Sequence, residues 1–322
     1  MNLKLDIVYM RIWAILFIVA HHSIHIYWYW PVNTDIPALS PLFMLSLSTI
    51  FKNIGLAIFT YISGMLVFYQ ASKRTTLHHF ITKKIKRLLL PALIWGILYH
   101  ILFPHYESNK IPTFINGNHL WYLLMLFTCM LSSLPLILNL KHKWSIVIVI
   151  YSIISLCSHL NWTFIEFRFY FPIFIIGYIS SYLKEKSITF SPKINLIFLF
   201  ISFSLIILYI EIPSTNSFIL FFSCILNMTA ICYITSYIFN HIKYKSIKPI
   251  TTTLNNSTFT IYLLHQFVIN FLIKNNLLLN YNLWYCNMII CFLTGIIIPI
   301  AFSFIINKLS VNYHLPFLKN LL

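Results

Sequence analysis

The sequence predicts an all-α fold: a polytopic transmembrane helix bundle with about ten spans, each needing about twenty apolar residues to cross a bilayer. Three observations support this class. Hydrophobic residues make up 59% of the 322 residues and charged residues only 9%, whereas soluble domains are about one-quarter charged. Mean hydropathy is +0.82. Long apolar stretches also recur along the whole chain, so we expect an integral membrane protein.

The apolar stretches are separated by short polar connections. No small-residue cleavage site follows the first stretch, so we expect it to stay as a helix and not to be removed as a signal peptide. The stretch Leu88–Phe103 carries Pro91 near its start. The number of spans could therefore be nine or eleven instead of ten. The predicted span centres are Phe17, Tyr61, Trp95, Met125, Val149, Ile175, Phe200, Leu226, Leu264 and Ile296.

Basic residues are concentrated in alternate connections, and this pattern predicts the orientation. The other connections, which alternate with the basic ones, hold few basic residues but contain Asp35, Glu107, Glu166 and Glu211. By the positive-inside rule the basic connections face the cytoplasm, so both termini should be cytoplasmic and the number of spans even. The basic residues of these connections are Lys4; Lys73, Arg74, Lys83, Lys84, Lys86 and Arg87; Lys141 and Lys143; Lys184, Lys186 and Lys193; Lys243, Lys245 and Lys248; Lys308 and Lys319.

The net charge of +16 is explained by this orientation signal and by attraction to anionic membrane lipid. It does not indicate a nucleic-acid partner. No repeat, low-complexity tract or linker divides the chain, so we expect a single transmembrane domain over residues 1–322. The six cysteines lie singly without C-x-x-C spacing, which is typical of small core residues and not of a metal or redox site.

The first predicted span, MRIWAILFIVAHHSIHIYWYW, contains ionisable side chains that are expensive inside a membrane. Arg11 and His22 are eleven residues apart, close to three helical turns, so both should face one side about 16 Å apart. Taken alone, the arginine could reach lipid phosphate and the histidine could be hydrogen-bonded in the bundle. His21 and His25 could bind a metal, but no third ligand lies nearby in sequence. We therefore predict no metal site.

A second basic cluster, KRTTLHHFITKKIKRLLLP, runs into the third span. Lys84 and Arg87 should share one helical face there. Paired cations at a membrane-level helix start suit phosphate or pyrophosphate, although an ordinary cytoplasmic loop would carry the same residues.

These motifs resemble the membrane-bound acyltransferase-3 family, which includes bacterial O-antigen and exopolysaccharide O-acetyltransferases, and the resemblance runs nearly end to end. In that family the first helix opens with an arginine and carries a histidine eleven residues later, as Arg11 and His22 do here. The family's R-x-x-R before a proline is similar to Lys84-x-x-Arg87 before Pro91. The matching residues of the second span are Gly55, Phe59, Ser63 and Gly64.

Two later motifs extend the resemblance. HLWYL, starting at His119, is similar to the family's Leu-Trp-Phe motif, and NNSTFTIYLLHQ resembles its late Ser...Tyr-Leu-x-His signature, with Ser257, Tyr262, Leu263 and His265. The chain departs from the pattern at Ile12, where the family usually has glycine, and at Lys84, which keeps the charge of arginine without its bidentate geometry.

The resemblance implies an enzyme of the bacterial inner membrane that moves an acyl group, usually acetyl, from cytoplasmic acyl-CoA to a hydroxyl of a cell-surface glycan or lipid-linked saccharide. Arg11, Lys84 and Arg87 would then bind the phosphates of CoA, and His22 would act as general base or carry the acyl group. Ser63, Tyr262 and His265 are possible supporting residues. No carboxylate that would orient His22 is evident.

The alternative is a secondary transporter or polysaccharide-export component without chemistry, because intramembrane charges also mark transport paths. Transporters favour inverted repeats and helices interrupted by glycine or proline. The chain has only six glycines and no evident internal symmetry, and we therefore favour the acyltransferase.

Overall fold

The computed structural model describes residues 3–25, 41–72, 76–103, 118–156, 162–185, 244–278 and 283–312. All regular elements within these ranges are helices, which confirms the predicted all-α class. The predicted spans centred on Phe200 and Leu226 lie outside the described residues, as do both ends of the chain.

Four described segments are long and apolar enough to cross a membrane. They coincide with the first, second, third and last predicted spans. Two shorter apolar helices occur at the fourth and fifth predicted spans. The protein is therefore a multi-pass membrane protein, while the count of about ten and the cytoplasmic termini stay predictions. The four segments are Ile7–Ile24, Leu47–Ala71, Leu77–Leu102 and Tyr285–Ser310.

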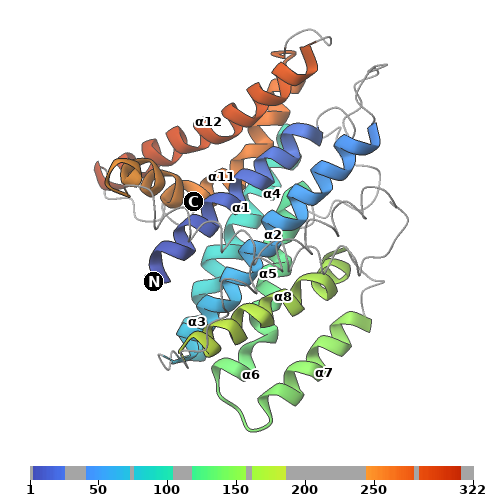
Figure 1. Ribbon diagram of the computed structural model, residues 1–322, viewed down its shortest axis with the longest axis vertical. Helices are drawn as coiled ribbons and strands as arrows, with labels where there is room; N and C mark the ends of the chain where they lie inside the picture. Colours follow the sequence, from blue (N-terminus) through green and yellow to red (C-terminus); the bar gives the residue numbers. More distant parts are fainter. Residues whose placement is uncertain are drawn as a thin grey trace. The chain divides into compact units, whose positions relative to one another are not determined.

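The helices form two compact units. The first unit comprises Met1–Phe59 and Phe190–Ile305, and the second comprises Thr60–Thr189 and Ile306–Leu322. The first unit contains α1 (Leu3–His25), the start of α2 (Pro41–Ser72), α11 (Tyr244–Lys274) and most of α12 (Trp284–Asn312) (Figure 1). The second unit contains the rest of α2, then α3 (Leu77–Lys84), a π-helix η1 (Ile85–Leu89), α4 (Leu90–Leu102), η3 (Asn118–Leu120), α5 (Trp121–Ser132), α6 (Leu134–Ile137), α7 (Lys143–Leu156) and α8 (Trp162–Glu185).

In the first unit, α1 packs along α11. Glycines of α2 and α12 allow these two helices to approach α1 closely. A Cβ added to Gly55 of α2 would lie 2.8 Å from the carbonyl oxygen of Ala14 on α1. A Cβ on Gly295 of α12 would lie 3.2 Å from Cγ1 of Val19 and 3.7 Å from Cβ of His265. Membrane helices associate through such small residues because apolar burial gives little driving force in lipid.

In the second unit, α2 and α8 are in backbone contact through two glycines. A Cβ on Gly64 would overlap the carbonyl oxygen of Phe174, and a Cβ on Gly177 would overlap that of Tyr61. Each helix thus presents a glycine to the backbone of the other. The Ser180 hydroxyl donates a 2.7 Å hydrogen bond to the Tyr61 hydroxyl beside this contact. No larger residue fits at either glycine without moving the helices apart.

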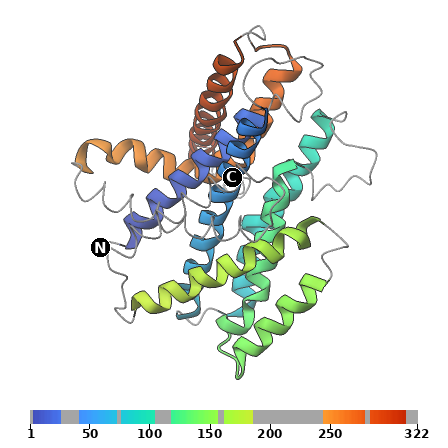
Figure 2. The same cartoon turned by 45° about the vertical axis from the view of Figure 1, so that its right-hand side comes forward.

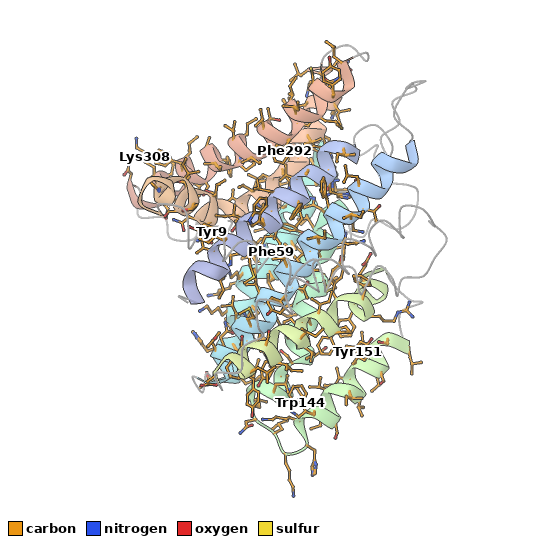
Figure 3. The ribbon with its side chains drawn as sticks, in the orientation of Figure 1. Tyr9, Phe59, Trp144, Tyr151, Phe292 and Lys308 are labelled. Atoms are coloured by element: carbon orange, nitrogen blue, oxygen red, sulfur yellow. The ribbon has the colours of Figure 1, made fainter. Side chains whose placement is uncertain are left out.

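Helix α7 packs against α8 through aromatic side chains. Tyr151 stacks on Phe171 with ring centroids 5.6 Å apart, and Trp144 meets Tyr178 edge-on at 5.9 Å. Figure 3 shows Trp144 and Tyr151 between the two helices, and Figure 2 shows the same pair of helices from a second direction. A short turn joins α6 to α7, with Asn139 in the left-handed region at φ 50°, where asparagine is tolerated better than most residues.

Large apolar side chains point outward from several helices. Ile148 of α7 is 62% exposed, and Ile297 and Phe304 of α12 are 60% and 70% exposed. Such side chains would be costly in water but suit contact with lipid hydrocarbon. On α12, by contrast, the polar side chains of Asn287, Ser303 and Ser310 are buried.

Candidate active site

In the first unit, α1 and α11 bring two histidines into ring contact. The imidazole centroids of His22 and His265 are 4.9 Å apart, with an interplanar angle of 54°. The ring of Tyr262 lies 6.1 Å from that of His265, one turn earlier on α11. His22 is half-buried, whereas Tyr262 and His265 are buried. The histidine predicted as catalytic and two of the predicted supporting residues therefore form one cluster.

The tautomer of His265 follows from its hydrogen bond within α11. Its Nδ1 lies 2.8 Å from the carbonyl oxygen of Ile261. A carbonyl oxygen can only accept a hydrogen bond, so Nδ1 must carry the proton. In the neutral ring the lone pair then belongs to Nε2, the nitrogen at the far end of the side chain.

His21 joins this cluster through Ser48 of α2. Its Nδ1 lies 2.9 Å from the Ser48 carbonyl oxygen and 2.7 Å from Oγ, while the Ser48 hydroxyl donates to the His21 carbonyl oxygen at 3.3 Å. Both residues are buried. The ring of His21 is 4.6 Å from that of His22, at an interplanar angle of 66°. Sequence reasoning missed this contact, because Ser46, Ser48 and Thr49 lie close together and no pattern distinguishes Ser48 from the other two.

Arg11 lies on the same uninterrupted helix as His22. The helical rise of about 1.5 Å per residue places the two residues about 16 Å apart along the axis, on one side. The arginine is half-buried and has interactions within the protein. The side chain of His25 lies outside the described residues.

Lys84 and Arg87 lie in the second unit, at the junction of α3 and the π-helix. Lys84 is buried at 8% exposure, with Nζ 5.2 Å from the ring centroid of Phe80, whereas Arg87 is exposed. Arg87 lies in the π-turn and not in a regular α-helix, so the shared face of Lys84 and Arg87 stays a prediction. π-turns of this kind often occur at functional sites.

The other motif residues have packing roles that can be described. Gly55 and Gly64 are the close-contact positions of α2, and Ser63, half-buried, belongs to the second unit. The HLWYL motif builds the core of that unit: Trp121 and Tyr122 contact the ring of Tyr170 on α8 at 6.4 and 6.2 Å. The buried Tyr122 hydroxyl also bonds Oγ1 of Thr60 at 3.0 Å.

No group of three or more His, Cys, Asp or Glu side chains that could hold a metal occurs in the part of the chain that the structure describes. The histidine cluster contains imidazoles, a hydroxyl and a phenol. These groups can accept, hold and return protons or act as nucleophiles, and can therefore support acyl transfer to a hydroxyl.

Comparison with known families agrees with this chemistry. The sequence profile of the acyltransferase-3 family, described as an acyltransferase domain, matches residues 4–308. No curated protein and no solved structure matches the chain. The match covers nearly the whole chain and includes the histidine cluster, Arg11, Lys84 and Arg87. The protein therefore belongs to the acyltransferase-3 family and is a membrane acyltransferase.

Proposed function

We propose that the protein is an O-acyltransferase that moves an acyl group, usually acetyl, from cytoplasmic acyl-CoA to a hydroxyl of a cell-surface glycan or lipid-linked saccharide. The bacterial inner membrane is its proposed location. The observation that carries the proposal is the contact between His22, on a candidate membrane-spanning helix, and His265 of α11, in a chain that belongs to the acyltransferase-3 family. Buried ionisable groups in membrane helices are functional sites by default.

His22 is the proposed catalytic residue. Its imidazole takes the proton of the acceptor hydroxyl while that oxygen attacks the thioester carbon. The carbon–sulfur bond then breaks, the ester forms, and the departing CoA thiolate takes the proton from the imidazolium. Neutral imidazole is regenerated, so each turnover consumes one thioester and one hydroxyl and releases one ester and one thiol. An acyl-imidazole intermediate on His22 would give the same products in two steps.

The donor's phosphates are the proposed ligands of Arg11, Lys84 and Arg87. Guanidinium groups bind phosphate with two parallel hydrogen bonds, and ammonium groups bind it as point charges. In the proposed orientation Arg11 precedes His22 on the path from the cytoplasm, which suits a donor whose anionic end stays at the cytoplasmic side while its thioester reaches inward. Ser63, Tyr262 and His265 are the proposed supporting residues, and His265 contacts His22 directly.

Release of free CoA from acetyl-CoA tests this function. Inverted membrane vesicles from producing cells expose the cytoplasmic face and retain the host's own acceptors. Vesicles with the intact protein should release CoA thiol. Vesicles with an equal amount of the His22→Ala variant should release no more thiol than vesicles without the protein. The exposed His78 on α3 provides the control, because His78→Ala should behave like the intact protein. Equal thiol release with and without the protein would contradict the proposal.

A further inference from the structure

We propose that His21, held by Ser48, is a positioning residue for His22 and acts together with the ring of His265. This inference rests on the proposed function of His22. The observation behind it is that His22 makes ring contacts with two imidazoles, one from α1 itself and one from α11.

The two flanking imidazoles have the same fixed tautomer. Nδ1 of His21 lies 2.9 Å from the Ser48 carbonyl oxygen, and Nδ1 of His265 lies 2.8 Å from the Ile261 carbonyl oxygen. Each nitrogen must donate its proton to a main-chain acceptor. Each neutral ring consequently keeps its lone pair on Nε2, and neither ring can rotate without breaking a buried hydrogen bond.

Buried hydrogen bonds of this kind are costly to break. A buried polar group that loses its partner destabilises the fold, and within a bilayer no water is present to replace the partner. His21 has a second restraint, because Oγ of Ser48 lies 2.7 Å from the same nitrogen and the Ser48 hydroxyl donates back to the His21 carbonyl oxygen. The position of the His21 ring is therefore fixed by two helices, α1 and α2.

The ring contacts restrict where the His22 imidazole can lie. The two pairs are inclined at 66° and 54°, with centroids 4.6 and 4.9 Å apart. Because the His21 ring is held by Ser48 and the His265 ring by its own helix, the His22 imidazole lies against two fixed rings. The flanking rings thus orient His22.

Three variants separate a positioning role from simple packing. His21→Phe keeps a ring beside His22 but removes the Nδ1 donor. His21→Asn keeps a donor that can reach Ser48 but removes the ring. Ser48→Ala leaves the carbonyl acceptor and removes only the hydroxyl, so its effect should be the smallest. Turnover and KM for acetyl-CoA are measured by thiol release in inverted vesicles, and folded protein is quantified by size-exclusion chromatography.

We expect His21→Phe and His21→Asn to lower turnover per folded molecule about 10- to 100-fold, by analogy with the loss found when an orienting partner of a metal-bound histidine is removed. KM for acetyl-CoA should change less than about two-fold, since donor binding belongs to other residues. The double variant His21→Phe with Ser48→Ala should be no slower than His21→Phe alone, because the hydroxyl acts through His21.

Two outcomes would overturn the inference: wild-type turnover per folded molecule in His21→Phe, or losses that match the loss of folded protein. Failure of the proposed function gives a different result, because the wild-type vesicles would then release no thiol above background and His22→Ala would have nothing to abolish.

Discussion

The ring of His22 lies 4.9 Å from that of His265, so the first and the penultimate described helices meet at the proposed catalytic group. The Nδ1 proton of His265 is held by the Ile261 carbonyl. We predict that His265→Ala lowers turnover about 10- to 100-fold by removing one of the two rings that position His22. KM for acetyl-CoA should be unchanged in the same thiol-release assay. A KM effect without a turnover effect would assign His265 to donor binding instead.

Substitution of Arg11 should weaken donor binding more than it slows chemistry. A hydrogen bond to a charged group contributes about 1.5–3 kcal/mol, so Arg11→Ala should raise KM for acetyl-CoA about 10- to 100-fold. Arg11→Lys should be intermediate, because it keeps the charge and loses the planar fork. The control is Lys308→Ala, which removes an exposed cation of α12. A lower turnover with normal KM in Arg11→Ala would contradict the proposed phosphate contact.

Gly64 and Gly177 should be intolerant of any side chain. A Cβ at either position would overlap a main-chain carbonyl of the facing helix, and backbone cannot move aside as a side chain can. We expect Gly64→Ala and Gly177→Ala to destabilise the protein by about 1–3 kcal/mol or more, measured as thermal unfolding in detergent. Gly295→Ala is the matched comparison, because its Cβ would meet the Val19 side chain at 3.2 Å and should be tolerated better. Equal stability of all three variants would refute the backbone-contact account.

Asn270 should limit the stability of the first unit. Its side chain is fully buried, and neither its amide nitrogen nor its oxygen has a hydrogen-bond partner within the described part of the chain. Such a group costs about 1–3 kcal/mol, so Asn270→Leu should raise the unfolding temperature. Asn287→Leu is the control, since Asn287 is also buried but does have a partner. A lower unfolding temperature for Asn270→Leu would show that the amide makes a stabilising contact.

Periodicity and composition predicted the helical class, because in lipid the backbone N–H and C=O groups must bond to one another and a helix satisfies them within one segment. The eleven-residue spacing of Arg11 and His22 predicted a shared helix side, and α1 is indeed one uninterrupted helix. Resemblance to a family, and not spacing, singled out Tyr262 and His265. No local pattern links them to the first span, since the contact depends on how α1 packs on α11.

Other features have no signal in the sequence. The contact of His21 with Ser48 depends on the register between α1 and α2, and the hydroxyl residues Ser46, Ser48 and Thr49 do not reveal that register. The π-turn after Lys84 replaces i→i+4 by i→i+5 hydrogen bonding, and the residues Ile85–Leu89 would suit a regular helix equally well. The glycines of α2 matched a family motif, but nothing in the sequence shows that Gly64 meets the backbone of Phe174.

The most direct test of the account is mass spectrometry of the host's surface glycans, with and without alkali treatment. Cells would carry the intact protein, His22→Ala, His78→Ala or no protein, with membrane abundance matched. The account predicts an alkali-labile ester, with the mass of an acyl group, in cells with the intact protein and with His78→Ala only. Identical glycans in all four strains, or an ester that persists in His22→Ala, would contradict the assignment of His22 as the catalytic residue of glycan acylation.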